Sequence, residues 1–77
     1  MYLLRMPDVT RASGLARPTI YRGIRRGLFP KPVKIGRVSA WPAGEVEAIN
    51  AARVAGKSED EIRQLVANLE GMRRAAG

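Results

Sequence analysis

Residues 14–27 are GLARPTIYRGIRRG, and this stretch decides the fold. Gly14 is the residue type that commonly ends a helix in the left-handed conformation. Pro18 is tolerated in the first turn of a helix, where its missing N–H would have no partner. The stretch therefore predicts a tight turn and then a helix that begins near Ala16 or Arg17 and ends at Gly27. A glycine turn between two short helices is typical of a helix-turn-helix.

This predicted helix has one apolar face and one cationic face. At 3.6 residues per turn Ile20 and Ile24 lie together, with Gly27 beside them. The opposite side carries Pro18, Thr19, Arg22, Arg25 and Arg26. Three arginines within five residues, without acidic neighbours to pair with, favour a nucleic-acid contact over a solvated surface.

A short helix and a hairpin flank the central stretch. The helix is expected over residues 7–13, with Asp8 at its positively polarised end. After the cationic helix two prolines exclude further helix, and residues 33–35 and 38–41 are expected to form two short strands around a turn at Gly36. This hairpin is the candidate wing of a winged helix-turn-helix. We expect Phe29 in the core, and Trp41 either in the core or at the base of the wing.

Two more helices are predicted in the second half of the chain. Residues 43–55 are rich in helix formers, and Ser58 with Glu61 is a capping box that opens a last helix over residues 58–74. The apolar stripe of this last helix is Ile62, Leu65, Val66, Leu69 and Met72. The stripe either packs on the chain's own domain or forms a homodimer. The predicted fold is mainly α with a small β-hairpin: a winged helix-turn-helix over residues 1–55, followed by an amphipathic helix.

The composition excludes several classes of protein. The 77 residues contain neither cysteine nor histidine, so a disulfide framework and the usual zinc ligands are missing, and we expect no cofactor and no metal. The carboxylates have no partner at a catalytic spacing, so we expect no enzyme. Because no apolar run is long enough to cross a bilayer, we expect a cytoplasmic, nucleoid-associated protein that does not contact membranes.

Positive charge is concentrated in the first half of the chain. The net charge is +7, and residues 1–41 hold nine Lys and Arg against Asp8 alone, whereas residues 42–77 sum to −1. A nucleic-acid binder concentrates cations on the elements that meet phosphates. The charge therefore predicts a nucleic acid as the partner, and a cationic helix suited to the major groove points to double-stranded DNA.

The predicted DNA-contacting residues lie on the cationic helix and on the wing. They are Arg17, Thr19, Tyr21, Arg22, Arg25 and Arg26 on the helix and Lys31, Lys34, Arg37 and Ser39 on the wing. Arg22 and Arg25 are the best candidates for reading guanine in the major groove, and Arg26 for gripping the backbone. Tyr21 either contacts a phosphate or covers the edge of the core. The wing is expected to contact phosphates or the adjacent minor groove.

Several segments together match a known pattern. They are LLRMPDV at 3–9, TIYR at 19–22, FPKPVKIG at 29–36, Trp41, and the helix over 45–53. In this combination the chain resembles the AlpA family of small phage and prophage regulators, relatives of MerR-type and excisionase DNA-binding domains. The resemblance implies a winged helix-turn-helix that binds double-stranded DNA. The helix from Ser58 onward is not covered by it.

The chain departs from the family pattern at three places. Ala16 stands where members often have a serine, so the cationic helix lacks its usual side-chain cap. The segment 36–41 is one residue shorter than usual, and Ile49 stands where an aromatic residue is common.

Three functions follow from these observations. The leading one is a sequence-specific transcriptional regulator of phage or mobile-element origin. The second is an excisionase-like recombination directionality factor that bends DNA and recruits an integrase. The third, from another class, is a protein-binding module that docks on a repressor or RNA polymerase without touching DNA.

Overall fold

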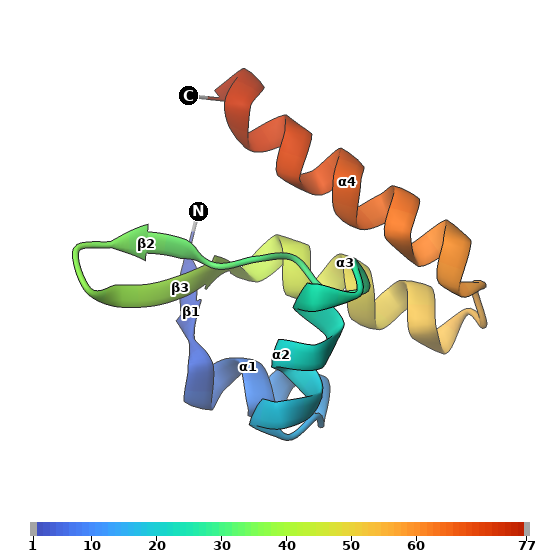
Figure 1. Cartoon of the computed structure of the whole chain (residues 1–77), viewed down its shortest axis with the longest axis horizontal. Coiled ribbons are helices and arrows are strands. Elements are labelled where there is room, and N and C mark those ends of the chain that lie inside the picture. The colour runs from blue at the N-terminus through green and yellow to red at the C-terminus, as the bar shows by residue number, and fades with distance from the viewer. Residues whose placement is uncertain (1, 77) are drawn as a thin grey trace.

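The computed structural model describes residues 2–76, with side chains described up to Arg73. Within this range the elements are β1 (Leu3–Arg5), α1 (Met6–Ser13), α2 (Arg17–Arg25), β2 (Val33–Ile35), β3 (Val38–Pro42), α3 (Ala43–Val54) and α4 (Glu59–Ala76). The protein is thus mainly helical with a small antiparallel sheet, which confirms the predicted fold class (Figure 1). Over the described residues no helix has the length and apolar character needed to span a bilayer.

The sheet has one strand more than the predicted hairpin. Its order is β1-β3-β2, with β3 antiparallel to both neighbours. Leu4 pairs with Trp41 on one side of β3, and Lys34 pairs with Ser39 on the other. We did not predict β1, because it pairs with residues 40–42 and not with a neighbouring segment that could form a hairpin with it.

The turns around α2 follow from glycine. Gly14 adopts a φ of 72° and donates its N–H to the Thr10 carbonyl at 2.9 Å, which ends α1. At the other end Leu28 donates to the Gly23 carbonyl at 2.8 Å and Gly27, at φ 74°, donates to the Ile24 carbonyl at 3.2 Å. These two bonds are those of a Schellman motif, so Gly27 is the residue just beyond the helix rather than its last residue.

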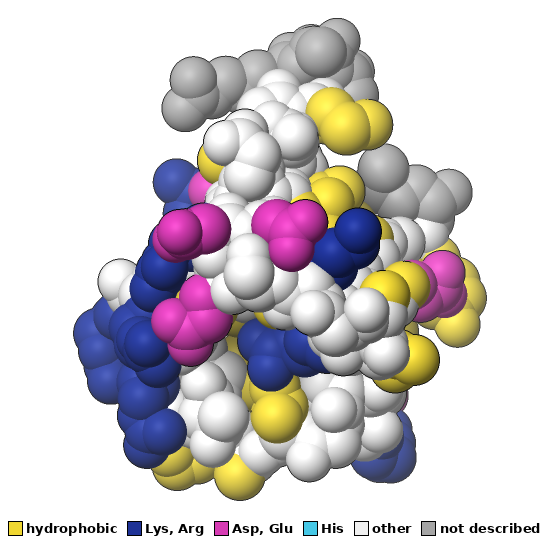
Figure 2. Space-filling view, turned by 90° about the vertical axis from the view of Figure 1, so that its right-hand side faces the viewer, with side chains coloured by type: hydrophobic (Ala, Val, Ile, Leu, Met, Phe, Trp, Pro, Cys, Tyr) yellow, Lys and Arg dark blue, Asp and Glu magenta, His cyan; other side chains and the backbone are white. Residues whose placement is uncertain are grey.

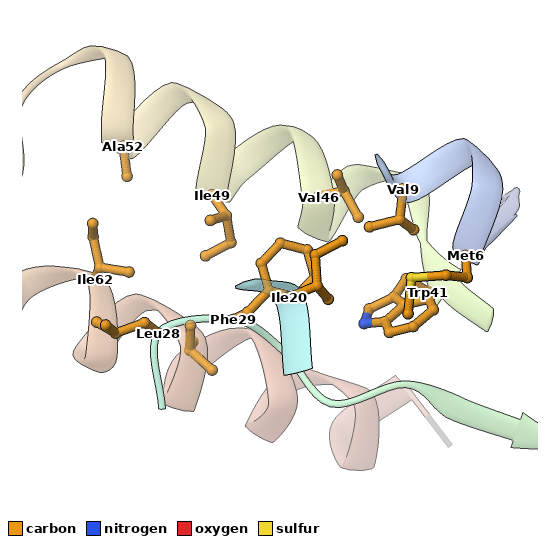
Figure 3. Packing of buried hydrophobic residues seen from close by; sticks show 11 residues of the cluster. Met6, Val9, Ile20, Leu28, Phe29, Trp41, Val46, Ile49, Ala52 and Ile62 are labelled. Carbon is orange, nitrogen blue, oxygen red and sulfur yellow. The ribbon is translucent and has the colours of Figure 1, made fainter. Parts of the chain in front are cut away.

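The core lies between α1, α2, α3 and the sheet (Figure 3). Its largest fully buried side chains are Val9, Ile20, Phe29, Trp41, Val46 and Ile49. Phe29 and Trp41 meet edge to face with ring centroids 6.4 Å apart, and Trp41 Nε1 donates to the Pro30 carbonyl at 2.8 Å. Both residues are therefore in the core, as predicted for Phe29 and as one of the two positions predicted for Trp41. A Cβ at Gly23 would lie 3.2 Å from Phe29 Cβ, so a glycine lets α2 approach this close.

The apolar stripe of α4 packs on the chain's own domain. Ile62 and Val66 belong to the core, and Leu65 and Leu69 are half-buried against it. Of the five stripe residues Met72 alone is exposed, at 64%. The stripe is therefore largely covered within one chain, which is the first of the two roles left open by the sequence.

Candidate nucleic-acid interface

The outer face of α2 is cationic and open to solvent. Its exposed side chains are Arg17, Pro18, Tyr21, Arg22, Arg25 and Arg26. Ile20 is buried on the opposite side, while Ile24 and Thr19 are half-buried. Figure 2 shows Lys and Arg side chains gathered in a column along one side of the molecule. Tyr21 is 48% exposed, so its ring covers part of the surface but is not a core residue.

This helix starts without a side-chain cap. Ala16 has the extended backbone of an N-cap residue, at φ −74° and ψ 157°, but no side-chain hydrogen bond. The serine that is common at this position in the AlpA family, which the sequence resembles, would supply an acceptor here.

A hollow of about 570 Å³ opens beside the start of α2. Its lining includes Arg5 at the end of β1, Arg17 at the start of α2 and Arg37 in the turn of the hairpin. Asp8 also lines it, but its carboxylate is held by Arg11 at 2.6 Å. Three segments distant in sequence therefore each contribute an arginine to the lining of one hollow, and an arginine-lined hollow suits a phosphate.

Arg5 is the functional candidate that the sequence analysis missed. Arg5 is the N-cap residue of α1, and its backbone N–H donates to the Asp8 carboxylate at 3.3 Å. The signal available in the sequence was a lone arginine directly before the start of a helix, and that signal says nothing about proximity to Arg17 or Arg37.

The wing carries one hydrogen-bonded pair of polar residues and an exposed arginine in its turn. Lys34 and Ser39 are cross-strand partners, and Lys34 Nζ donates to Ser39 Oγ at 2.8 Å. Arg37 is exposed in the turn next to Gly36, which has a φ of 63°. Ser39 and Arg37 both line the hollow, so this part of the wing lies on the same side as the start of α2.

The prediction that the arginines of α2 lack acidic partners is wrong for Arg26. Glu59, in the first turn of α4, lies 3.3 Å from Arg26 Nη2. The two residues are 33 positions apart, so inspection of sequence neighbours could not reveal the pair. Both side chains remain half exposed. Arg26 is therefore accessible, but Glu59 partly balances its positive charge.

Lys31 lies against α4. Its N–H donates to Glu70 Oε2 at 2.9 Å, and its carbonyl accepts a hydrogen bond from Arg73 Nη2 at 2.8 Å. It lines a second hollow together with Ala67, Glu70, Gly71 and Arg73. Lys31 is therefore separate from the set that surrounds the first hollow.

A buried ion pair ties α3 to α4. Glu45 is 8% exposed and accepts Arg73 Nε at 2.9 Å, with a second bond from Arg73 Nη2. The hydrogen bond to Glu45 favours the charged guanidinium and raises the pKa of Arg73 above its ordinary value. This ion pair holds α4 against α3. It does not involve the arginines of α2.

Comparison with known proteins identifies the family. A profile described as "Prophage CP4-57 regulatory protein (AlpA)" matches residues 2–54. The chain belongs to the AlpA family. The match spans β1 to the end of α3 and excludes α4. Membership of a family of prophage regulatory proteins points to a regulator rather than an enzyme, and it confirms the resemblance seen in the sequence.

One curated phage protein is a relative. The uncharacterized protein ORF88 of Enterobacteria phage P4 is 47% identical over 55 residues, which are 70% of this chain. The chain spans 62% of the length of that relative. No solved structure matches the chain. The phage relative agrees with a phage origin for this regulator.

Proposed function

We propose that the protein is a sequence-specific regulator that binds duplex DNA, with α2 in the major groove and the β2–β3 wing on the adjacent backbone. The observation that carries this proposal is the convergence of Arg5, Arg17 and Arg37 around one hollow next to the exposed face of α2. These residues come from the end of a strand, the start of a helix and the turn of a hairpin. A duplex backbone is a ligand that engages all of them at once.

The exposed face of α2 supplies the reading function. The major groove admits an α-helix, and an arginine can donate two parallel hydrogen bonds to O6 and N7 of guanine. Arg22 and Arg25 are exposed, and neither has an ion pair among the described residues. They are therefore available for base contacts. Arg17 at the hollow and Arg37 on the wing then serve as backbone contacts on either side.

The test is a titration of a labelled duplex that the wild-type protein has selected from a random 20-base-pair library. Arg17→Ala and Arg37→Ala should each weaken binding roughly tenfold, since a hydrogen bond to a charged group contributes about 1.5–3 kcal/mol. Each should also reduce the slope of log affinity against log salt by about 0.9, because one phosphate contact is lost.

Lys57→Ala is the matched control. Lys57 is an exposed cation between α3 and α4, and its loss changes the net charge by the same amount. Affinity and salt slope should stay close to those of the wild type. If Lys57→Ala weakens binding as much as Arg17→Ala does, the hollow has no special role. If the wild type selects no duplex at all, the protein is not a DNA-binding regulator. That result would favour the third function, a module that binds another protein.

A further inference from the structure

The helix α4 contacts Arg26, which directly follows α2, and Lys31, in the segment that leads into the wing. Figure 1 shows it along one side of the molecule, next to α3. It lies outside the segment that matches the family, residues 2–54, yet its polar contacts go to Arg26 and Lys31 inside that segment. This arrangement calls for a role beyond covering the core.

Its first contact is with the C-terminal end of α2. The last carbonyls of a helix have no partner within the helix and need one from elsewhere. Arg63 Nε donates to the Arg26 carbonyl at 2.9 Å, while Glu59 holds the Arg26 side chain. The aliphatic part of Arg63 also lies over Gly27, where a Cβ would be 3.7 Å from Arg63 Cγ. Two residues of α4 therefore fix the end of the reading helix.

The second contact is with the segment that leads into the wing. Pro30 and Pro32 have no N–H to donate, so Lys31 has the only backbone donor of these three residues. Glu70 accepts that N–H and Arg73 donates to the Lys31 carbonyl. Arg73 is itself held by the buried Glu45 of α3. Lys31 is the root of the wing, and both its N–H and its carbonyl are thus hydrogen-bonded to α4.

We infer that α4 is a strut that sets the position of the wing relative to α2, and that Arg63 and Glu70 are positioning residues for DNA recognition. Arg63 and Arg73 are ten residues apart on one helix, which spans about 15 Å at a rise of 1.5 Å per residue. α2 and the wing must dock in a groove and on a backbone at the same time. Because one rigid helix already holds both, less conformational entropy is lost when they bind. This inference rests on the proposed DNA-binding function.

Glu70→Ala tests the strut because charge and positioning predict opposite results. Removal of a negative charge alone should tighten binding to any duplex. Release of the wing root should instead weaken binding to the selected duplex by about fivefold, the equivalent of one net hydrogen bond. Affinity for poly(dI-dC), which depends on charge, should not fall. Glu47→Ala is the matched control, since Glu47 is exposed on α3 and its removal gives the same charge change. It should bind both duplexes at least as tightly as the wild type.

A distance measurement without DNA provides an independent readout. The chain has no cysteine, so Arg22→Cys and Ile35→Cys place one nitroxide label on exposed α2 and one on exposed β2. Pulsed electron paramagnetic resonance should give one narrow distance distribution for the otherwise wild-type chain and for Glu47→Ala. Glu70→Ala should broaden it. Arg63→Ala should broaden it too, and Arg63→Lys, which keeps a donor for the Arg26 carbonyl, should restore most of the narrow peak.

The two readouts separate the strut from the proposed function. If no duplex is bound but Glu70→Ala and Arg63→Ala broaden the distribution, the DNA proposal fails and the strut stands. If DNA is bound but both variants, shown to be folded by thermal melting, keep the narrow distribution and the wild-type preference for the selected duplex, the strut is wrong. Should Glu70→Ala fail to fold, the Arg63 pair of variants decides between the same two results.

Discussion

Loss of the Glu45–Arg73 ion pair should be the most costly single polar change in the chain. Arg73→Ala removes both bonds to the Glu45 carboxylate and the bond to the Lys31 carbonyl. It leaves a carboxylate that is 8% exposed without its counter-charge. Breaking one partner of a buried pair costs about 3–5 kcal/mol. Because the Arg73 side chain is still 21% exposed, solvent screens part of the interaction, and we expect the lower end, about 3 kcal/mol.

That loss is large for a protein of this size. At about 0.05–0.15 kcal/mol per residue, a chain of 77 residues has a free energy of unfolding of roughly 4–12 kcal/mol. Urea unfolding followed by circular dichroism measures the difference, provided that the slope with urea is unchanged. Asp60→Ala is the comparison, because Asp60 is 95% exposed and its pair with Arg63 should contribute under about 1 kcal/mol.

A double replacement separates the lost bonds from the stranded charge. Glu45→Met combined with Arg73→Met removes the pair without leaving a buried carboxylate, so it should recover much of the stability lost in Arg73→Ala. The reasoning is refuted if Arg73→Ala costs no more than Asp60→Ala, or if the double variant is less stable than the single one.

Three further predictions follow from the local geometry. Ala16→Ser places an acceptor at an N-cap with suitable backbone angles, so it should add about 1 kcal/mol and raise the melting temperature by roughly 4–8 °C; an unchanged melting curve contradicts it. Glu61 accepts the Ser58 N–H, which lowers the pKa of its carboxyl below 4.5, so its contribution to stability is present above that value and is lost as pH falls through the lowered pKa. A ¹³C titration of that carboxyl with an ordinary midpoint would disprove this. Arg25→Ala should relax preference at one base position while Arg37→Ala weakens all duplexes alike, and base-preference profiles showing the reverse would exchange their roles.

Local signals predicted the helices and the hairpin well. Gly14 and Gly27 both adopt positive φ at helix ends, as their positions suggested, and the capping box of Ser58 and Glu61 forms with hydrogen bonds of 2.9 and 3.2 Å. These features depend on residues a few positions apart. The third strand escaped prediction because three residues pair with β3 only after the fold brings the chain's start to its middle.

The site was predictable residue by residue but not as an assembly. The exposure of Arg22 and Arg25 follows from the helical period, which the sequence shows directly. Arg5 and Arg37 line the same hollow because of the order of the strands in the sheet, and the pairing of Arg26 with Glu59 depends on where α4 packs. Contacts between residues more than 30 positions apart leave no periodic signal in one sequence.

The salt dependence of duplex binding by the whole chain tests the central claim most directly. The exposed cations proposed to meet phosphates are Arg5, Arg17, Arg26, Lys34 and Arg37. If roughly five phosphates are neutralised, log affinity should fall against log salt with a slope of about −4 to −5. A slope near zero, or binding to the selected duplex that survives high salt unchanged, would contradict the assignment of this surface to DNA.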